Sequence, residues 1–150
     1  MAEILLGSHV GMSGKEMFLG SVKEAESYGA NVLMVYTGAP QNTRRKEIGE
    51  LRIDEGISYA EKAGIREIVI HAPYIINLGN MEKPEMFDFG VEFLAKEVKR
   101  AAAFHSKVLV LHPGSSLSAG VEASVEQIAK GLNLVLDADD SEVNIALETM

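Results

Sequence analysis

Three side chains that can bind a metal ion follow apolar runs of the chain. His71 follows EIVI, His112 follows KVLVL and Glu148 follows VNIAL. If these runs are neighbouring parallel strands, about 4.8 Å apart, the three side chains can converge on one point. Two imidazoles and a carboxylate, with one position left for water, match a catalytic zinc site. Each histidine alone could merely hydrogen-bond a loop, but three ligands in one register favour a metal centre.

The composition restricts what else the chain can be. Its 150 residues, 47% of them hydrophobic, are enough for one domain with a core. The chain has no cysteine, which excludes disulfides and thiolate ligands and leaves His and carboxylates for any metal. It shows neither a run of about 18 apolar residues nor an N-terminal signal segment. We therefore expect a cytoplasmic protein that does not contact a membrane.

The elements that must position the ligands are five apolar runs separated by segments of helical periodicity. The runs are continuous rather than alternating, which is typical of parallel strands buried on both faces. The predicted strands are Ile4 to Ser8, Asn31 to Tyr36, Glu67 to Ile70, Lys107 to Leu111 and Val143 to Leu147. The predicted helices are Gly14 to Tyr28, Lys46 to Ala63, a third that begins near Pro84, and Val121 to Leu136.

Local signals mark the ends and faces of these helices. Ser13 and Glu16 have the spacing of a capping box before the first helix, and Gly64 is a typical stop for the second. The fourth helix carries an apolar stripe that is expected to face the sheet. Its members are Val121, Val125, Ile128, Leu132 and Leu136.

The (βα)₄β pattern fits either an open doubly wound sheet or part of a (β/α)₈ barrel. In both, functional side chains gather at the carboxyl ends of the parallel strands. The segment GSHVGMSG after the first strand lacks the G-x-G-x-x-G spacing of a dinucleotide site. A nucleotide-binding interpretation is therefore disfavoured.

Further candidates follow the other predicted strands. Tyr74 and Ile75 lie beside His71, where apolar side chains either open a base stack or cover a barrel mouth. His9, at the end of the first strand, is either a phosphate donor or a structural histidine. The loop after the second strand is polar and basic, which suits contacts to phosphates. The candidates for such phosphate contacts are Asn42, Arg44 and Arg45.

Taken in order, GSHVGMSG, YTGAPQNTRRK, HAPYIINLGN, HPGS and ALETM resemble the endonuclease IV family, over the whole chain. The resemblance implies a (β/α)₈ TIM barrel, an α/β fold of which residues 1–150 are the first (βα)₄β half of a single domain. It also implies a cluster of three zinc ions, with His71, His112 and Glu148 as ligands. Glu148 would bridge two metals and be the catalytic residue. At most one zinc would be fully liganded by this chain.

The resemblance further implies a DNA repair endonuclease that uses a zinc-activated hydroxide. The substrate would be double-stranded DNA, cut at the phosphodiester 5′ to an abasic site, and the resemblance favours Tyr74 and Ile75 as the wedge. The intact enzyme would be monomeric, whereas a half barrel with open edges is expected to self-associate and to have little activity. The net charge of −8 counts against DNA binding, although bound cations would dominate the local field.

Two other hypotheses remain open. A xylose isomerase-like sugar isomerase or epimerase shares the barrel and its carboxylate and histidine ligands, but it needs a closed pocket. The HAPYIINLGN loop beside a basic loop suits a polymer substrate better. The other hypothesis is an inactive barrel fragment that acts only as a folding or assembly module.

Overall fold

A computed structural model describes residues 4–150 of the chain. Strands and helices alternate along it. The elements are β1 (Gly7–His9), α1 (Met17–Ser27), β2 (Val32–Tyr36), the 3₁₀ helix η1 (Ile48–Glu50), α2 (Ile53–Ala63), β3 (Glu67–His71), α3 (Pro84–Ala103), β4 (Val108–Leu111), α4 (Val121–Asp137) and β5 (Asn144–Leu147).

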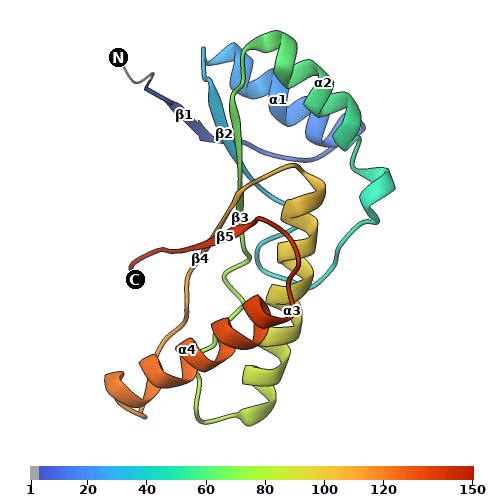
Figure 1. The fold of residues 1–150 in the computed structure, drawn as a ribbon. Coiled ribbons are helices and arrows are strands. Elements are labelled where there is room, and N and C mark those ends of the chain that lie inside the picture. The colour runs from blue at the N-terminus through green and yellow to red at the C-terminus, as the bar shows by residue number, and fades with distance from the viewer. Residues whose placement is uncertain (1–3) are drawn as a thin grey trace.

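The five strands form one parallel sheet in the order β1-β2-β3-β4-β5. Each strand pairs with the next strand along the chain, and βαβ crossovers are right-handed. Every helix therefore lies on the same side of the sheet. Figure 1 shows the helices along the outer side of a curved sheet whose inner side is open. This arrangement confirms the predicted half of a TIM barrel. A doubly wound sheet would reverse its strand order and carry helices on both faces.

The core lies between the sheet and the helices. Leu33 and Val35 on β2 and Leu109 on β4 are fully buried there, and Phe18 of α1 meets Phe104 edge to face at 4.9 Å. The alternate residues of β2 and β4 are only partly buried. The prediction of burial on both faces is therefore met on the helix side alone, because within residues 4–150 nothing closes the inner face. No helix among these residues is both long and apolar enough to cross a membrane.

The predicted capping box of α1 is wrong. The N-cap residue is Glu16, and no side chain caps the helix. The backbone carbonyl of Ser13 accepts the Met17 N–H at 3.3 Å, while the Glu16 carboxylate pairs with Lys23 at 2.6 Å. The Glu16 side chain therefore pairs along the helix surface instead of returning to the backbone of Ser13.

The second predicted helix is shorter than expected. The segment 46–63 divides into η1 and α2, and Arg52 between them has a left-handed backbone with φ of 52°. The break allows Leu51, which is 1% exposed, to enter the core, where its carbonyl accepts the Phe18 N–H at 3.1 Å. The predicted stop at Gly64 is confirmed by its φ of 77°.

The packed face of α4 differs from the predicted stripe. Its buried residues are Ser124, Gly131 and Val135, whereas three members of the stripe are exposed: Val121, Val125 and Leu136. Ser124 and Gln127 hydrogen-bond backbone carbonyls of the β3–α3 loop, at Gly79 and at Leu78 and Asn80. The other two members of the stripe, Ile128 and Leu132, pack against the core and are partly buried. Hydrophobic periodicity therefore found part of this face and missed the contacts made by polar and small residues.

A glycine substitution tests the close packing of α1 on α2. A Cβ at Gly56 would lie 2.4 Å from the Phe18 ring, whereas a Cβ at Gly49 meets nothing within 4 Å. Overpacking costs about 1–3 kcal/mol, which outweighs the roughly 0.5–1 kcal/mol gained when alanine replaces a helical glycine. Gly56→Ala should therefore lower the free energy of unfolding in urea titrations. Gly49→Ala is the control, and equal stability of both variants would contradict the packing.

Candidate metal centre

The parallel register brings the three predicted ligands to one edge of the sheet. His71 is the last residue of β3, and His112 and Glu148 directly follow β4 and β5. Leu111 is paired with Leu147, so the residues that follow them leave the sheet side by side. One potential ligand atom from each of the three residues lies within 4.8 Å of the other two. The structure thus brings together the three side chains that the sequence proposes as ligands.

The donor atoms are spaced like ligands of a shared ion. Oε2 of Glu148 lies 3.0 Å from Nε2 of His71 and 3.4 Å from Nε2 of His112. Such separations fit ligand atoms that are each about 2.0–2.2 Å from one zinc ion. Two imidazoles and a carboxylate also leave a coordination position for water. The residues present therefore fit a catalytic metal.

Backbone contacts orient these ligands. Nδ1 of His71 lies 2.7 Å from the Ala72 carbonyl, which can only accept, so Nδ1 carries the proton. With Nδ1 so engaged, Nε2 is the ring atom that could bind a metal, as in many metal-bound histidines. The Glu148 N–H donates to the Leu111 carbonyl at 2.9 Å, which fixes the backbone beneath the carboxylate.

A row of rings extends from the candidate ligands across the strand ends. Ring centroids lie 4.6 Å apart for His9 and Tyr36, 5.0 Å for Tyr36 and His71, and 5.2 Å for His71 and His112. Burial, together with His71, lowers the pKa of His9. Burial also raises the pKa of Tyr36, with Glu148 and Tyr74 adding to the effect, so its hydroxyl keeps its proton at neutral pH. Sequence reasoning missed Tyr36, although its place at a strand end was a usable signal.

Tyr74 and Ile75 have different environments. Tyr74 is 56% exposed, whereas Ile75 is partly buried and packs against the core. Tyr74 and His112 together line a cavity of about 290 Å³. Tyr74 is therefore available for contact beside a candidate ligand, whereas Ile75 is largely engaged in the core.

The β3–α3 loop is fixed by a side chain that sequence reasoning did not single out. Oδ1 of Asn77 accepts the N–H groups of Gly79 and Ser115, both at 3.0 Å, and so joins the loops after β3 and β4. Gly114 has a φ of 118°, and a Cβ there would lie 2.1 Å from Asn77 Oδ1. The glycine of HPGS therefore allows this close approach.

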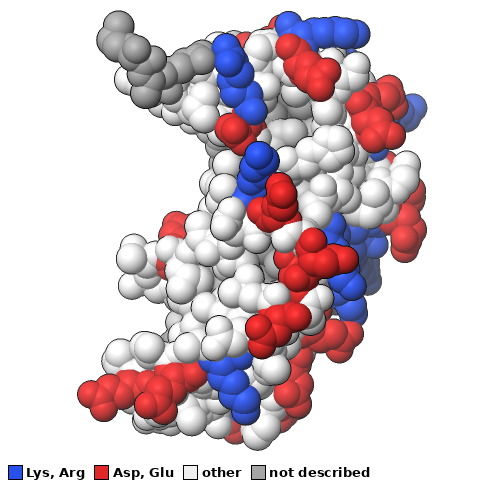
Figure 2. All heavy atoms as spheres, in the orientation of Figure 1, with Lys and Arg blue, Asp and Glu red and all other residues white. Residues whose placement is uncertain are grey.

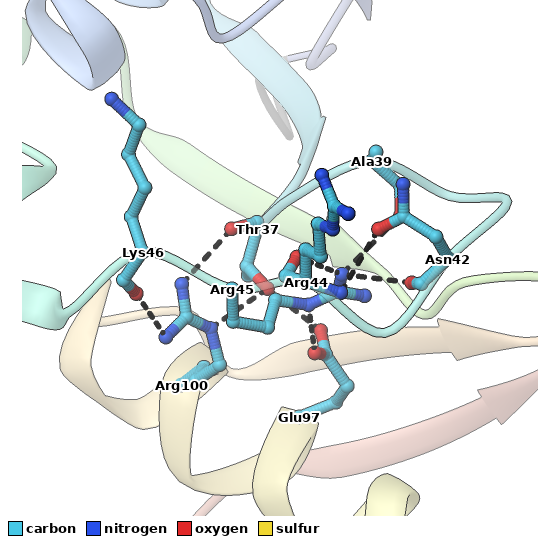
Figure 3. A network of polar contacts seen from close by, with 8 residues as sticks. All are labelled: Thr37, Ala39, Asn42, Arg44, Arg45, Lys46, Glu97 and Arg100. Carbon is cyan, nitrogen blue, oxygen red and sulfur yellow. Dashed lines mark hydrogen bonds and ion pairs between the residues drawn. The ribbon is translucent and has the colours of Figure 1, made fainter.

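The three candidates in the β2–α2 loop also differ (Figure 3). The side chain of Arg45 is 11% exposed and pairs with the fully buried Glu97, with Nε 2.6 Å from Oε1. Arg44 is exposed, and its N–H donates to Oδ1 of Asn42 at 2.9 Å. The structure thus places Arg45 inside the loop and Arg44 on its surface.

Comparison with known proteins agrees with this fold. The chain matches the family described as xylose isomerase-like TIM barrel over residues 22–150, and it belongs to that family. It is 61% identical over 145 residues to the probable endonuclease 4 of Lachnoclostridium phytofermentans, covering 97% of this chain and 48% of that protein. For the probable endonuclease 4 of Lysinibacillus sphaericus, the identity is 58% over 147 residues, with 98% and 49% covered. The chain thus spans about half the length of these relatives.

Comparison with solved structures also identifies the same fold. Endonuclease IV from Thermus thermophilus superposes with a TM-score of 0.75 at 26% identity, covering 95% of this chain and 51% of that one. A D-psicose 3-epimerase superposes with a TM-score of 0.67 at 14% identity, covering 95% and 52%. The second likeness shows the fold alone.

The candidate ligands can be tested by metal binding. His71→Ala should weaken zinc binding by roughly 100-fold or more, since even loss of a group that only supports a ligand costs about 10- to 100-fold. His105→Ala is the matched control, because His105 is exposed and lies outside the ligand cluster. Isothermal titration of the metal-free chain with zinc measures both affinities. Equal affinity in the two variants would show that zinc binds elsewhere.

Proposed function

We propose that this chain is the N-terminal half of a DNA repair endonuclease that hydrolyses the phosphodiester 5′ to abasic sites in duplex DNA. The observation that carries the proposal is the convergence of His71, His112 and Glu148 beside the exposed Tyr74. The identity of 57–61% to proteins named probable endonuclease 4 supports it.

In this proposal Nε2 of both histidines and the Glu148 carboxylate would hold zinc. Zinc bound there would lower the pKa of a coordinated water toward neutrality and offset negative charge on the reacting phosphate. His71 keeps its lone pair directed at the site through the Ala72 carbonyl. Glu148 faces both imidazoles and is the proposed bridging carboxylate. Three zinc ions would require ligands from the other half of the barrel.

The proposed DNA surface surrounds this centre. Tyr74 would enter the base stack at the lesion, with Ile75 supporting it, because an exposed aromatic ring can hold an unstacked step open. Asn42 and Arg44 would contact phosphates from the β2–α2 loop. His9, the ring at the β1 end of the row of rings, would donate a hydrogen bond to a phosphate. The side chain of Arg45 is buried within the loop, so Arg45 would support these contacts by holding the loop in place.

The net charge of −8 does not fix the local potential at the proposed DNA surface. In the view of Figure 2, acidic and basic side chains gather over the helices, whereas the concave side, which the second half of the barrel would cover, is largely uncharged. At the strand ends the proposed DNA surface carries the exposed cation Arg44. A bound metal would further raise the potential at the strand ends.

The sugar isomerase or epimerase alternative is not favoured. The likeness to solved sugar epimerases is 20% and 14% identity, which shows the barrel fold only. The relatives named probable endonuclease 4 are far closer in sequence. The exposed Tyr74 beside the metal ligands also suits a polymer better than a small enclosed sugar.

The open sheet affects the oligomeric state that we expect for the full-length protein and for residues 1–150 alone. Exposed apolar side chains lie near the two edge strands, at Ile4 and Leu6 just before β1 and at Leu147 at the end of β5. In the full-length protein, which we propose to contain both barrel halves and to be a cytoplasmic monomer, the second half would cover them. Residues 1–150 alone would self-associate, since unpaired strand edges and apolar faces promote association.

The wedge can be tested by replacing Tyr74 in the full-length protein. Tyr74→Ala should weaken binding to an abasic duplex far more than binding to the same abasic single strand. Opening a stack costs a few kcal/mol in a duplex and little in an unstacked strand. Tyr28→Ala is the control, because Tyr28 is also exposed but lies at the end of α1. Fluorescence anisotropy measures both affinities, and equal losses on the two DNAs would refute the wedge.

The endonuclease proposal itself is tested with a cleavage assay. The full-length protein with zinc should cut an abasic duplex, and Glu148→Gln should reduce the rate by at least about 10²-fold, as expected when a reacting group is misplaced. Glu142→Gln, an exposed acid just before β5, is the control.

The same assay applied to residues 1–150 alone should show little or no cleavage. A second metal bridged by Glu148 would lack its other ligands, so the attacking and leaving oxygens could not both be stabilised. Robust cleavage by a monomer of residues 1–150 that depends on Glu148 would contradict the need for a second half. No cleavage by the full-length protein would overturn the proposed function.

A further inference from the structure

A carboxylate lies where the amphipathic pattern of α3 calls for an apolar residue. Glu97 is fully buried, next to Leu94 and Val98 on the packed face of the helix. It accepts hydrogen bonds from Oγ1 of Thr37 at 2.7 Å and from Nε of Arg45 at 2.6 Å. A buried charge is costly unless it is paired and hydrogen-bonded. Both partners of Glu97 belong to the segment that leaves β2.

Arg45 uses the other side of its guanidinium to hold the loop together (Figure 3). Its Nη1 donates to three backbone carbonyls, at 3.3 Å for Ala39, 3.1 Å for Asn42 and 2.8 Å for Arg44. The guanidinium also lies 4.9 Å from the centre of the Phe93 ring. The backbone of the loop therefore surrounds the Arg45 guanidinium, which is itself paired with Glu97 of α3.

Arg100, one turn further along α3, ties both ends of the same loop. It donates to Oγ1 of Thr37 at 3.0 Å and to the Thr37 carbonyl at 2.9 Å. It also donates to the Lys46 carbonyl at 3.0 Å. The segment 37–46 is thus fixed at its start, at its end and through its middle.

This loop forms one wall of a cavity that also reaches the end of β2. The cavity has a volume of about 700 Å³, and its lining includes Tyr36, Asn42 and Arg44. Tyr36 contacts His71 ring to ring and is followed directly by Thr37. The shape of the loop therefore sets where Asn42 and Arg44 lie relative to the ligands.

We propose that Glu97 and Arg45 are positioning residues whose buried ion pair holds the β2–α2 loop ready to contact the DNA backbone through Asn42 and Arg44. This inference rests on the proposed function. Ordering a mobile loop on binding would cost free energy, and a loop already fixed by α3 avoids that cost. Arg45 contributes to DNA binding without touching DNA.

The test compares Glu97→Gln, the double variant Glu97→Gln/Arg45→Gln and the control Glu92→Gln in the full-length protein. Glu92 lies on α3 as well, but its pair with Lys96 is exposed, and such pairs contribute little to stability. The double variant removes both buried charges, which costs less stability than leaving one unpaired. It also removes the guanidinium that binds the three loop carbonyls.

Steady-state kinetics on an abasic duplex separate positioning from stability. Glu97→Gln should raise KM about 10-fold, within the roughly 10²-fold effect of misplaced groups, while kcat stays within about 3-fold. The double variant should regain much of the lost melting temperature but keep the raised KM. Glu92→Gln should match the unaltered protein. Recovery of KM together with melting temperature in the double variant would show that the pair serves stability only and would overturn the proposal.

Amide hydrogen exchange gives a readout that does not depend on activity. Exchange at residues 38–46 should rise in Glu97→Gln and in the double variant, and not in Glu92→Gln. Unchanged exchange there would overturn the positioning role even if the protein cleaves DNA. Increased exchange in a protein that neither binds nor cuts abasic DNA would confirm that the pair orders the loop but would overturn its role in DNA contact, and the proposed function would fail with it.

Discussion

The parallel register of the sheet is the constraint on which the rest of the structure depends. Because β3, β4 and β5 run side by side in the same direction, His71, His112 and Glu148 leave the sheet at the same edge. The same register adds His9 and Tyr36 to the row. Three potential ligand atoms within 4.8 Å then follow from strand order, with no long-range rearrangement of loops.

Much of this could be predicted from the sequence, because it rests on period and position. Apolar runs and glycine stops identify the strands and the end of α2, and a ligand type at three strand ends identifies the candidate centre. The features that escaped prediction are polar contacts between distant segments. Glu97 meets Thr37 across 60 positions, and Ser124 meets Gly79 across 45. No local propensity encodes such pairs, although a glutamate on an apolar helix face is a detectable signal.

The barrel architecture accounts for two features of the structure, the partly open inner face of the sheet and the loops that are held by the outer helices. An apolar inner sheet face, expected to be buried, stays partly open in a chain about half as long as the relatives it matches. In a closed barrel that face would be the packed interior, and the strand ends would form the floor of the site. The loops that leave this floor are held from outside by α3 and α4, through Glu97 and Arg100 in one case and Gln127 in the other. The outer helices therefore shape the rim of the site.

The central claim is that these strand ends form a metal centre, and locating the metal in a crystal tests it most directly. Crystals grown with zinc would be measured on both sides of the zinc absorption edge, so that anomalous difference maps locate the ion. We expect a peak bonded to Nε2 of His71, Nε2 of His112 and the Glu148 carboxylate. A map with no peak among these three side chains, or with zinc held only at other histidines such as His105, would contradict the claim.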